Sequence, residues 1–118
     1  MLESAVEEFL GRRVKAEGGK YLKFTSPGNS GVPDRIVILR GMVVFVELKQ
    51  DTGTLSKVQR TQIKSMTAQG AKVHVVYGKK GATLFMDWLK SHAYERWGKA
   101  DMMEWGKGKA NGEAGDEE

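Results

Sequence analysis

The chain has 118 residues, which is enough for one domain with a hydrophobic core but small for two. It contains no cysteine, and this excludes both a disulfide framework and a thiolate-bound zinc site. No apolar run approaches the roughly 18 residues that a membrane span requires, and the first twenty residues lack the apolar core of a signal peptide. We therefore expect a cytoplasmic protein that does not enter a membrane.

Charge is distributed unevenly along the chain. The net charge is +4, but residues 111–118 carry four acidic side chains and no basic one. Residues 1–110 contain 19 basic and 11 acidic residues, so this part of the chain carries +8. A body this basic suits a polyanion such as nucleic acid, although a solvated surface without a specific partner fits the charge equally well.

The first half of the chain predicts one helix and three strands. Apolar residues recur at helical spacing over 2–16, and alternation over 20–25 predicts a strand. A loop rich in turn-forming residues follows. The segments Asp34–Leu39 and Met42–Lys49 are β-branched and apolar, and Arg40-Gly41 between them indicates a hairpin.

The second half predicts a helix, a strand and a further helix. The helix covers Ser56–Gln69, and Ser56 followed three residues later by Gln59 is a capping-box pattern. Lys72–Tyr77 predicts a strand. A Gly-Lys-Lys-Gly turn then leads to a helix over 82–93. From about residue 98 glycine recurs and apolar periodicity is lost.

The element order α-β-β-β-α-β-α predicts an α/β fold. The hairpin strands are apolar on both faces, so we expect a mixed sheet covered by helices on each side. A helix connects the third strand to the fourth, which allows those two strands to be parallel. We expect a single domain over residues 1–95 and a C-terminal extension over 96–118, with 106–118 disordered.

The predicted hairpin brings charged side chains together. A two-residue turn at Arg40-Gly41 places Asp34 directly opposite Glu47, and opposed residues share one face of a sheet. Alternation along the strand puts Lys49 on the same face as Glu47. Two carboxylates and an amine would then converge at one end of an apolar hairpin, provided that the strand register is correct.

Two adjacent carboxylates repel each other unless something intervenes. One acid could hold a proton, Lys49 could bridge the pair, or a divalent cation could lie between them. Oxygen ligands suit Mg²⁺ or Mn²⁺, and the backbone carbonyl of Leu48 could be a further ligand. The alternative interpretation is a surface charge cluster at a strand end.

These residues also carry a family resemblance. Gly31-Val32-Pro33-Asp34, Glu47-Leu48-Lys49 and Gln59 together resemble the PD-(D/E)XK nuclease superfamily. More narrowly, residues 1–78 are similar to the small stand-alone, phage-like members of the VRR-NUC (virus-type replication-repair nuclease) family. The resemblance implies a restriction-endonuclease-like core, Mg²⁺ or Mn²⁺ as cofactor, and a homodimer that cleaves branched DNA such as Holliday junctions in a phage-infected or bacterial cell.

The resemblance also implies roles for individual residues. Asp34 and Glu47 would bind the metal, and Lys49 would orient or help deprotonate the attacking water. Gln59 would position Lys49 or the water from the second helix. The family also uses an acid on the first helix, for which Glu3 is the best match and Glu7, on the same helix face, the second choice.

A second set of residues is expected to contact DNA. Three of them recur at helical spacing on the second helix, and the others surround the loop before the predicted site. They are Lys23, Ser26, Arg35, Lys57, Arg60 and Lys64. His74, in the middle of a strand, is expected to be structural, and Trp88, Trp97 and Trp105 are expected to be core or interface anchors.

Two classes of function remain open. The leading one is a metal-dependent DNA endonuclease, either junction-selective or a flap or nicking repair nuclease. The other is a nucleic-acid-binding module without catalysis on the same fold. A protein that only binds DNA gains nothing from clustered acids facing a polyanion, which favours the enzyme.

Overall fold

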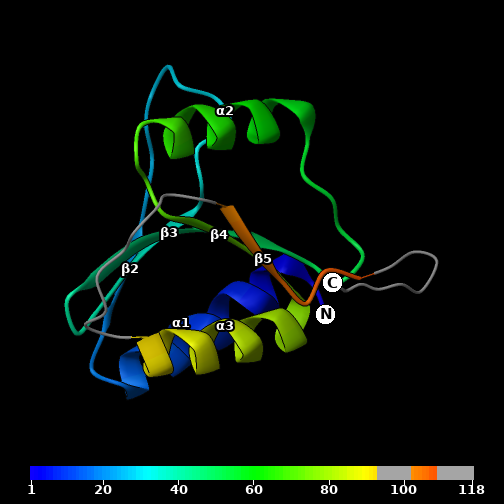
Figure 1. The fold of residues 1–118 in the computed structure, drawn as a ribbon. Coiled ribbons are helices and arrows are strands. Elements are labelled where there is room, and N and C mark those ends of the chain that lie inside the picture. The colour runs from blue at the N-terminus through cyan, green and yellow to red at the C-terminus, as the bar shows by residue number, and fades with distance from the viewer. Residues whose placement is uncertain (93–101, 109–118) are drawn as a thin grey trace.

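A computed structural model describes residues 1–92 and 102–108 of the chain. Five strands form a single mixed sheet in the order β1-β2-β3-β4-β5 (Figure 1). The first three strands are antiparallel, and β3, β4 and β5 run parallel. The elements in chain order are α1 (Glu3–Ala16), β1 (Lys20–Lys23), β2 (Arg35–Leu39), β3 (Met42–Lys49), α2 (Lys57–Ala68), β4 (Val73–Tyr77), α3 (Gly78–His92) and β5 (Met102–Trp105).

Helices cover both faces of the sheet, as the two-sided apolar strands predict. In Figure 1, α1 and α3 lie together on one face and α2 lies on the other. The larger apolar core forms under α1 and α3, and a smaller one under α2 around Ile63, Val75 and Tyr77. The second face is covered only in part, because Leu22 and Val43 remain 45% and 53% exposed. None of the described helices is long and apolar enough to cross a membrane.

The hairpin register is confirmed. Leu39 pairs with Met42 and Arg35 pairs with Val46, so the next opposed pair along this ladder is Asp34 and Glu47. The turn residues Arg40 and Gly41 have φ values of 46° and 90°. Positive φ at both central residues is typical of the type I′ turn, whose twist matches that of the flanking strands.

The C-terminal elements differ from the prediction in two respects. The helix α3 begins at Gly78, so the Gly-Lys-Lys-Gly segment is the first turn of this helix and not a separate turn. The strand β5 was not predicted at all, and it pairs with β4 at the edge of the main sheet. Part of the expected extension therefore belongs to the domain. Residues 106–108, expected to be disordered, are described, whereas 93–101 and 109–118, including Trp97, lie outside the described residues.

Candidate active site

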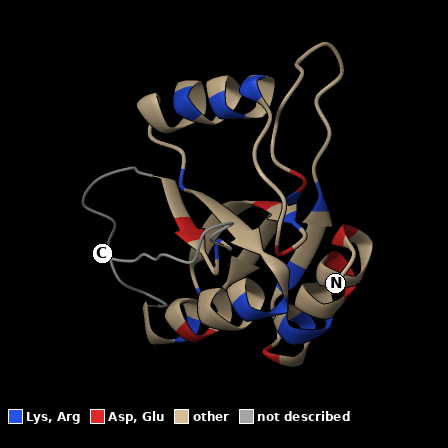
Figure 2. Ribbon diagram, turned by 90° about the vertical axis from the view of Figure 1, so that its right-hand side faces the viewer, with Lys and Arg blue, Asp and Glu red and all other residues tan. Residues whose placement is uncertain are grey.

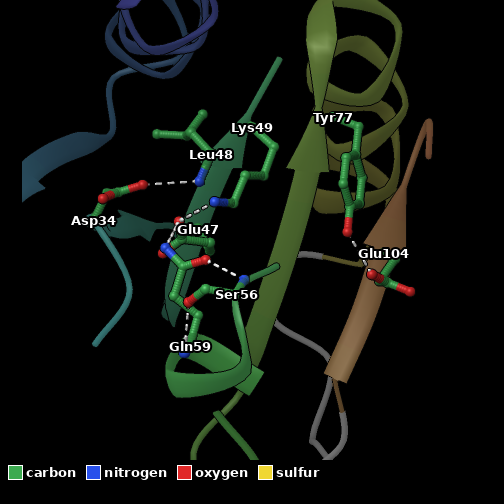
Figure 3. A network of polar contacts seen from close by, with 8 residues as sticks. All are labelled: Asp34, Glu47, Leu48, Lys49, Ser56, Gln59, Tyr77 and Glu104. Atoms are coloured by element: carbon green, nitrogen blue, oxygen red, sulfur yellow. Dashed lines mark hydrogen bonds and ion pairs between the residues drawn. The ribbon is translucent and has the colours of Figure 1, made fainter. Parts of the chain in front are cut away.

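Asp34 lies at the entrance of β2, between the loop of residues 24–33 and the sheet. Its backbone carbonyl accepts a hydrogen bond from the N–H of Phe24 at 2.9 Å, which continues the ladder between β1 and β2. Its Oδ2 accepts a hydrogen bond from the backbone N–H of Leu48 at 3.0 Å (Figure 3). The carboxylate of Asp34 therefore lies against β3, next to Leu48. The group of Leu48 that contacts Asp34 is its N–H, so its carbonyl as a ligand stays a prediction.

Glu47 is a buried acid on β3, with only 1% of its surface exposed. Its Oε2 accepts a hydrogen bond from Nε2 of Gln59 at 3.0 Å and lies 3.9 Å from Nζ of Lys49. Its Oε1 is also buried, yet no described group donates a hydrogen bond to it. A buried carboxylate oxygen without a donor is costly, and it marks a position where a cation or a proton belongs.

The surroundings of Glu47 oppose its ionisation. Burial raises the pKa of Glu47 to about 8, and the negative charge of Asp34 contributes to the increase. The ammonium group of Lys49 acts in the opposite direction and favours the ionised form. One positive charge does not offset burial together with a second carboxylate. In the absence of a cation, Glu47 therefore holds a proton near neutral pH.

Gln59 reaches this group from the first turn of α2. Ser56 is the N-cap of the helix, and Ser56 and Gln59 form the predicted capping box. The side chain of Gln59 was expected to position Lys49 or a water molecule. In the structure its Nε2 instead donates to the carboxylate of Glu47. Helix α2 thus contacts the acid directly.

The two candidate acids on α1 have different surroundings. Burial raises the pKa of Glu3, while the charge of Lys49 lowers it and that of Asp34 raises it. Glu3 therefore lies within electrostatic reach of the same group of charges. Glu7 instead forms an ion pair at 2.9 Å with Nε of Arg35. Glu7 is therefore engaged by Arg35, whereas Glu3 stays the candidate acid of α1 for the site.

The residues at this end of the hairpin fit a hard divalent cation. Within residues 1–92 and 102–108, no cluster of three or more acidic, histidine or cysteine side chains forms a ready-made metal cage. Mg²⁺ does not require one, because it usually takes one or two carboxylates and keeps several water molecules. Asp34 and Glu47 supply that number, and Oε1 of Glu47 still lacks a partner among the described residues.

The residues predicted to contact DNA are not all equally available. Lys57, Arg60 and Lys64 are exposed along α2, whose ribbon carries these basic positions in Figure 2. Lys23, at the end of β1, is also exposed. By contrast, the guanidinium group of Arg35 is engaged by Glu7 and lies 4.7 Å from the centre of the Tyr21 ring.

The loop residue Ser26 and the strand residue His74 both have partners inside the protein. Oγ of Ser26 accepts a hydrogen bond from Asn29 at 2.9 Å within the loop. His74 is fully buried, and its Nδ1 accepts a hydrogen bond from Nε1 of Trp105 at 3.0 Å. Burial lowers the pKa of His74 to about 4, so the ring is neutral at physiological pH, in keeping with a structural role. Trp88 packs against the same ring.

A second polar pair near the site was not found from the sequence. Tyr77 is the β4 neighbour of Lys49, and its hydroxyl donates a 2.8 Å hydrogen bond to Glu104 of β5 (Figure 3). Glu104 also lies 3.7 Å from Nζ of Lys107. The only signal in the sequence was the short, largely apolar run Met-Met-Glu-Trp over 102–105, which is too short to predict a strand by itself.

Comparisons with known proteins show which family the chain belongs to. A solved structure described as a VRR_NUC domain has 32% sequence identity with the chain and matches it with a TM-score of 0.62. The match covers 78% of this chain and 97% of that domain. The chain belongs to the VRR-NUC family.

This VRR-NUC chain is also similar in sequence to a phage protein. "Putative nuclease p44" of Acyrthosiphon pisum secondary endosymbiont phage 1 is 37% identical to it over 75 residues. That alignment spans 63% of the chain and 81% of the phage protein. No protein-family model matches the sequence.

Proposed function

We propose that this VRR-NUC protein is an Mg²⁺- or Mn²⁺-dependent endonuclease that hydrolyses phosphodiester bonds in DNA. The main support is the carboxyl group of Glu47. It is buried beside a second acid, it contacts Lys49 and Gln59, and its Oε1 lacks a hydrogen-bond donor among the described residues. A divalent cation would satisfy this oxygen and remove the repulsion between Glu47 and Asp34. The nuclease name of the phage relative agrees with this reading.

Each residue of the site has a separate task in the proposed mechanism. Asp34 and Glu47 would hold the cation, with Glu3 as a further acid at the start of α1. When bound, the cation supplies a more acidic water and neutralises charge on the phosphate. The ammonium group of Lys49 lies 3.9 Å from Glu47, where it can orient the attacking water and stabilise a phosphate oxygen. Gln59 keeps the carboxylate of Glu47 in place.

The substrate assignment rests on charge and on the family. The exposed face of α2 presents Lys57, Arg60 and Lys64 beside Gln59, so duplex phosphates bound there would lie close to the carboxylates. We extend the proposal to branched DNA, a homodimer, and a role in phage or bacterial replication and repair, because the family resemblance implies them. The partly uncovered sheet face around Leu22 and Val43 is compatible with a subunit contact.

The proposal is tested by cleavage of labelled four-way, flap and linear DNA in Mg²⁺, Mn²⁺ or EDTA. We expect Asp34→Asn and Glu47→Gln to lower the rate by orders of magnitude, since metal binding and orientation fail together. Asparagine is preferred to alanine at position 34 because it can still accept the Leu48 N–H, whose loss costs about 1–3 kcal/mol. Asp87→Asn, an exposed acid on α3, is the matched control.

The same assay separates the alternatives. Full metal-dependent cleavage by Asp34→Asn or Glu47→Gln would refute the assigned site. DNA binding without cleavage in either metal would favour the non-catalytic binding module. Preferential cleavage of flap or nicked DNA would show that the protein is a flap or nicking repair nuclease and not a junction resolvase. A monomeric mass in solution at the assay concentration would refute the homodimer.

A further inference from the structure

The side-chain amide of Gln59 uses both of its ends. Its Oε1 accepts a hydrogen bond from the backbone N–H of Ser56 at 2.9 Å, and its Nε2 donates to Oε2 of Glu47 at 3.0 Å. Oγ of Ser56 in turn accepts the backbone N–H of Gln59 at 3.1 Å. Figure 3 shows these contacts as one continuous chain from the start of α2 to the buried acid. The helix cap and the candidate active site therefore share one side chain.

This arrangement fixes which atom of Gln59 faces Glu47. A rotation of the amide by half a turn would bring its oxygen against the carboxylate and its NH₂ group against the Ser56 N–H. Both contacts would then be unfavourable, because one would join two acceptors and the other two donors. The backbone N–H of Ser56 can only donate, so the cap permits a single orientation of the amide.

The choice of glutamine at position 59 also indicates that this side chain serves Glu47 as well as the helix cap. For the cap alone, glutamate would serve as well as glutamine, because only an acceptor for the Ser56 N–H is required. At this position a glutamate would place a second carboxylate oxygen against Glu47. Glutamine provides the acceptor for the cap and the donor for the acid at once. A purely structural cap has no need of this donor.

We propose that Ser56 is a positioning residue for metal binding and acts through Gln59. Oγ of Ser56 fixes the backbone of Gln59, so that the amide oxygen of Gln59 meets the Ser56 N–H and its Nε2 meets Oε2 of Glu47. Oε1 of Glu47 is then left as the oxygen that faces the cation. This inference rests on the proposed metal site. It adds that the N-terminus of α2 helps to determine the affinity of that site before any DNA is bound.

The test is calorimetric titration of the full chain with Mn²⁺ in the absence of DNA. Ser56→Ala keeps the backbone N–H of residue 56 but removes the Oγ that fixes the Gln59 backbone. We expect it to weaken Mn²⁺ binding on the order of 10-fold, the size typical of groups that orient a metal ligand. Ser56→Thr, which retains the capping oxygen, should restore most of the affinity. In a Gln59→Leu background, Ser56→Ala should have no further effect, because its only route to Glu47 has been removed.

A second pair of substitutions controls for general loosening of α2. The double variant Thr61→Gly/Ser65→Gly changes two exposed positions in the middle of the helix and lowers its stability without touching Gln59. It should lower the melting temperature to a similar extent as Ser56→Ala but leave Mn²⁺ affinity unchanged.

Several outcomes would overturn the inference. These are wild-type affinity in Ser56→Ala, an equal loss of affinity in the glycine control, or additive effects of Ser56→Ala and Gln59→Leu. Failure of the wild-type protein to bind Mn²⁺ would instead refute the proposed metal site. The two failures are thus distinguishable in one series of titrations.

Discussion

Glu47 combines a place in the proposed metal site with an environment that opposes its charge. Burial and the neighbouring carboxylate of Asp34 keep the acid protonated near neutral pH, and Lys49 reduces this effect only in part. A bound cation would reverse the balance, because it favours the ionised form far more strongly than one ammonium group. The buried carboxyl group that would bind the proposed metal therefore destabilises the metal-free protein when it is ionised.

Replacing this acid should stabilise the metal-free protein. The pKa of Glu47 is about 8 in the folded chain and near its ordinary 4.5 in the unfolded chain. Between these values the folded state binds more protons at Glu47, so the stability linked to Glu47 is fully present below pH 4.5 and is lost as the pH rises through 8. We expect Glu47→Gln to raise the free energy of unfolding by about 4 kcal/mol at pH 8 and to have little effect at pH 4.5.

Urea unfolding at several pH values, in EDTA, measures this difference. Asp87→Asn serves as the control for loss of an exposed acid and should leave the pH dependence unchanged. Added Mn²⁺ should stabilise the wild-type protein and not Glu47→Gln. A stability difference that does not vary with pH would contradict the raised pKa.

His74 should produce the opposite dependence on pH at lower values. Its pKa is about 4 in the folded chain and 6.5 in the unfolded chain, so the unfolded state binds more protons between these values. Stability linked to His74 is therefore present above pH 6.5 and is lost as the pH falls towards 4. In His74→Asn, whose amide oxygen can still accept the Trp105 N–H, this loss should disappear from the acid unfolding curve. An unchanged curve would show that His74 is not the group responsible.

At the level of elements, the sequence predicts those features that depend on local pattern. The period of two along a strand and the two-residue turn were sufficient to place Asp34 opposite Glu47. The partner of Gln59 could not be predicted, because it depends on how α2 lies against the sheet. The strand β5 was missed because its four residues gain their hydrogen bonds from β4 and part of their burial from α3, neither of which a local pattern reveals.

The start of α3 was misplaced for a related reason. Its first turn contains Gly78 and Gly81, which are typical of a loop when read from the sequence alone. In the structure, a Cβ atom at Gly81 would overlap the backbone carbonyl of Trp105. The glycine allows β5 to approach the helix and does not mark a turn. Only the tertiary structure reveals this use of the residue.

Two glycines in the loop before Asp34 allow a matched test of loop packing. Gly28 and Gly31 have φ values of 82° and 85°. Backbone strain should therefore lower the free energy of unfolding by a similar amount, about 1 kcal/mol, when either glycine is replaced by alanine. A Cβ at Gly28 would meet nothing, whereas at Gly31 it would lie 2.6 Å from the carbonyl oxygen of Val58 in α2. We expect Gly31→Ala to reduce the melting temperature clearly more than Gly28→Ala. Equal reductions would show that this contact between the loop and α2 contributes nothing.

At the scale of the whole molecule, the charge distribution should govern DNA affinity. The body of the chain carries +8, and the four acids of residues 111–118 reduce the net charge to +4. Nucleic-acid binding is dominated by attraction to phosphates and by release of counterions, both of which depend on this charge. The acidic segment should therefore weaken binding even if it makes no specific contact with the body or with DNA.

Removal of residues 111–118 is expected to increase DNA affinity several-fold at low salt, measured in EDTA to prevent cleavage. The difference should shrink as salt is added, because screening reduces the influence of distant charges. Replacing the four acids by their amides changes the charge equally but preserves the length, so it should reproduce the effect. If truncation strengthens binding and the amide variant does not, the segment acts through its bulk and not its charge. If neither variant changes affinity, the phosphates are held by local contacts such as those offered by Lys57, Arg60 and Lys64.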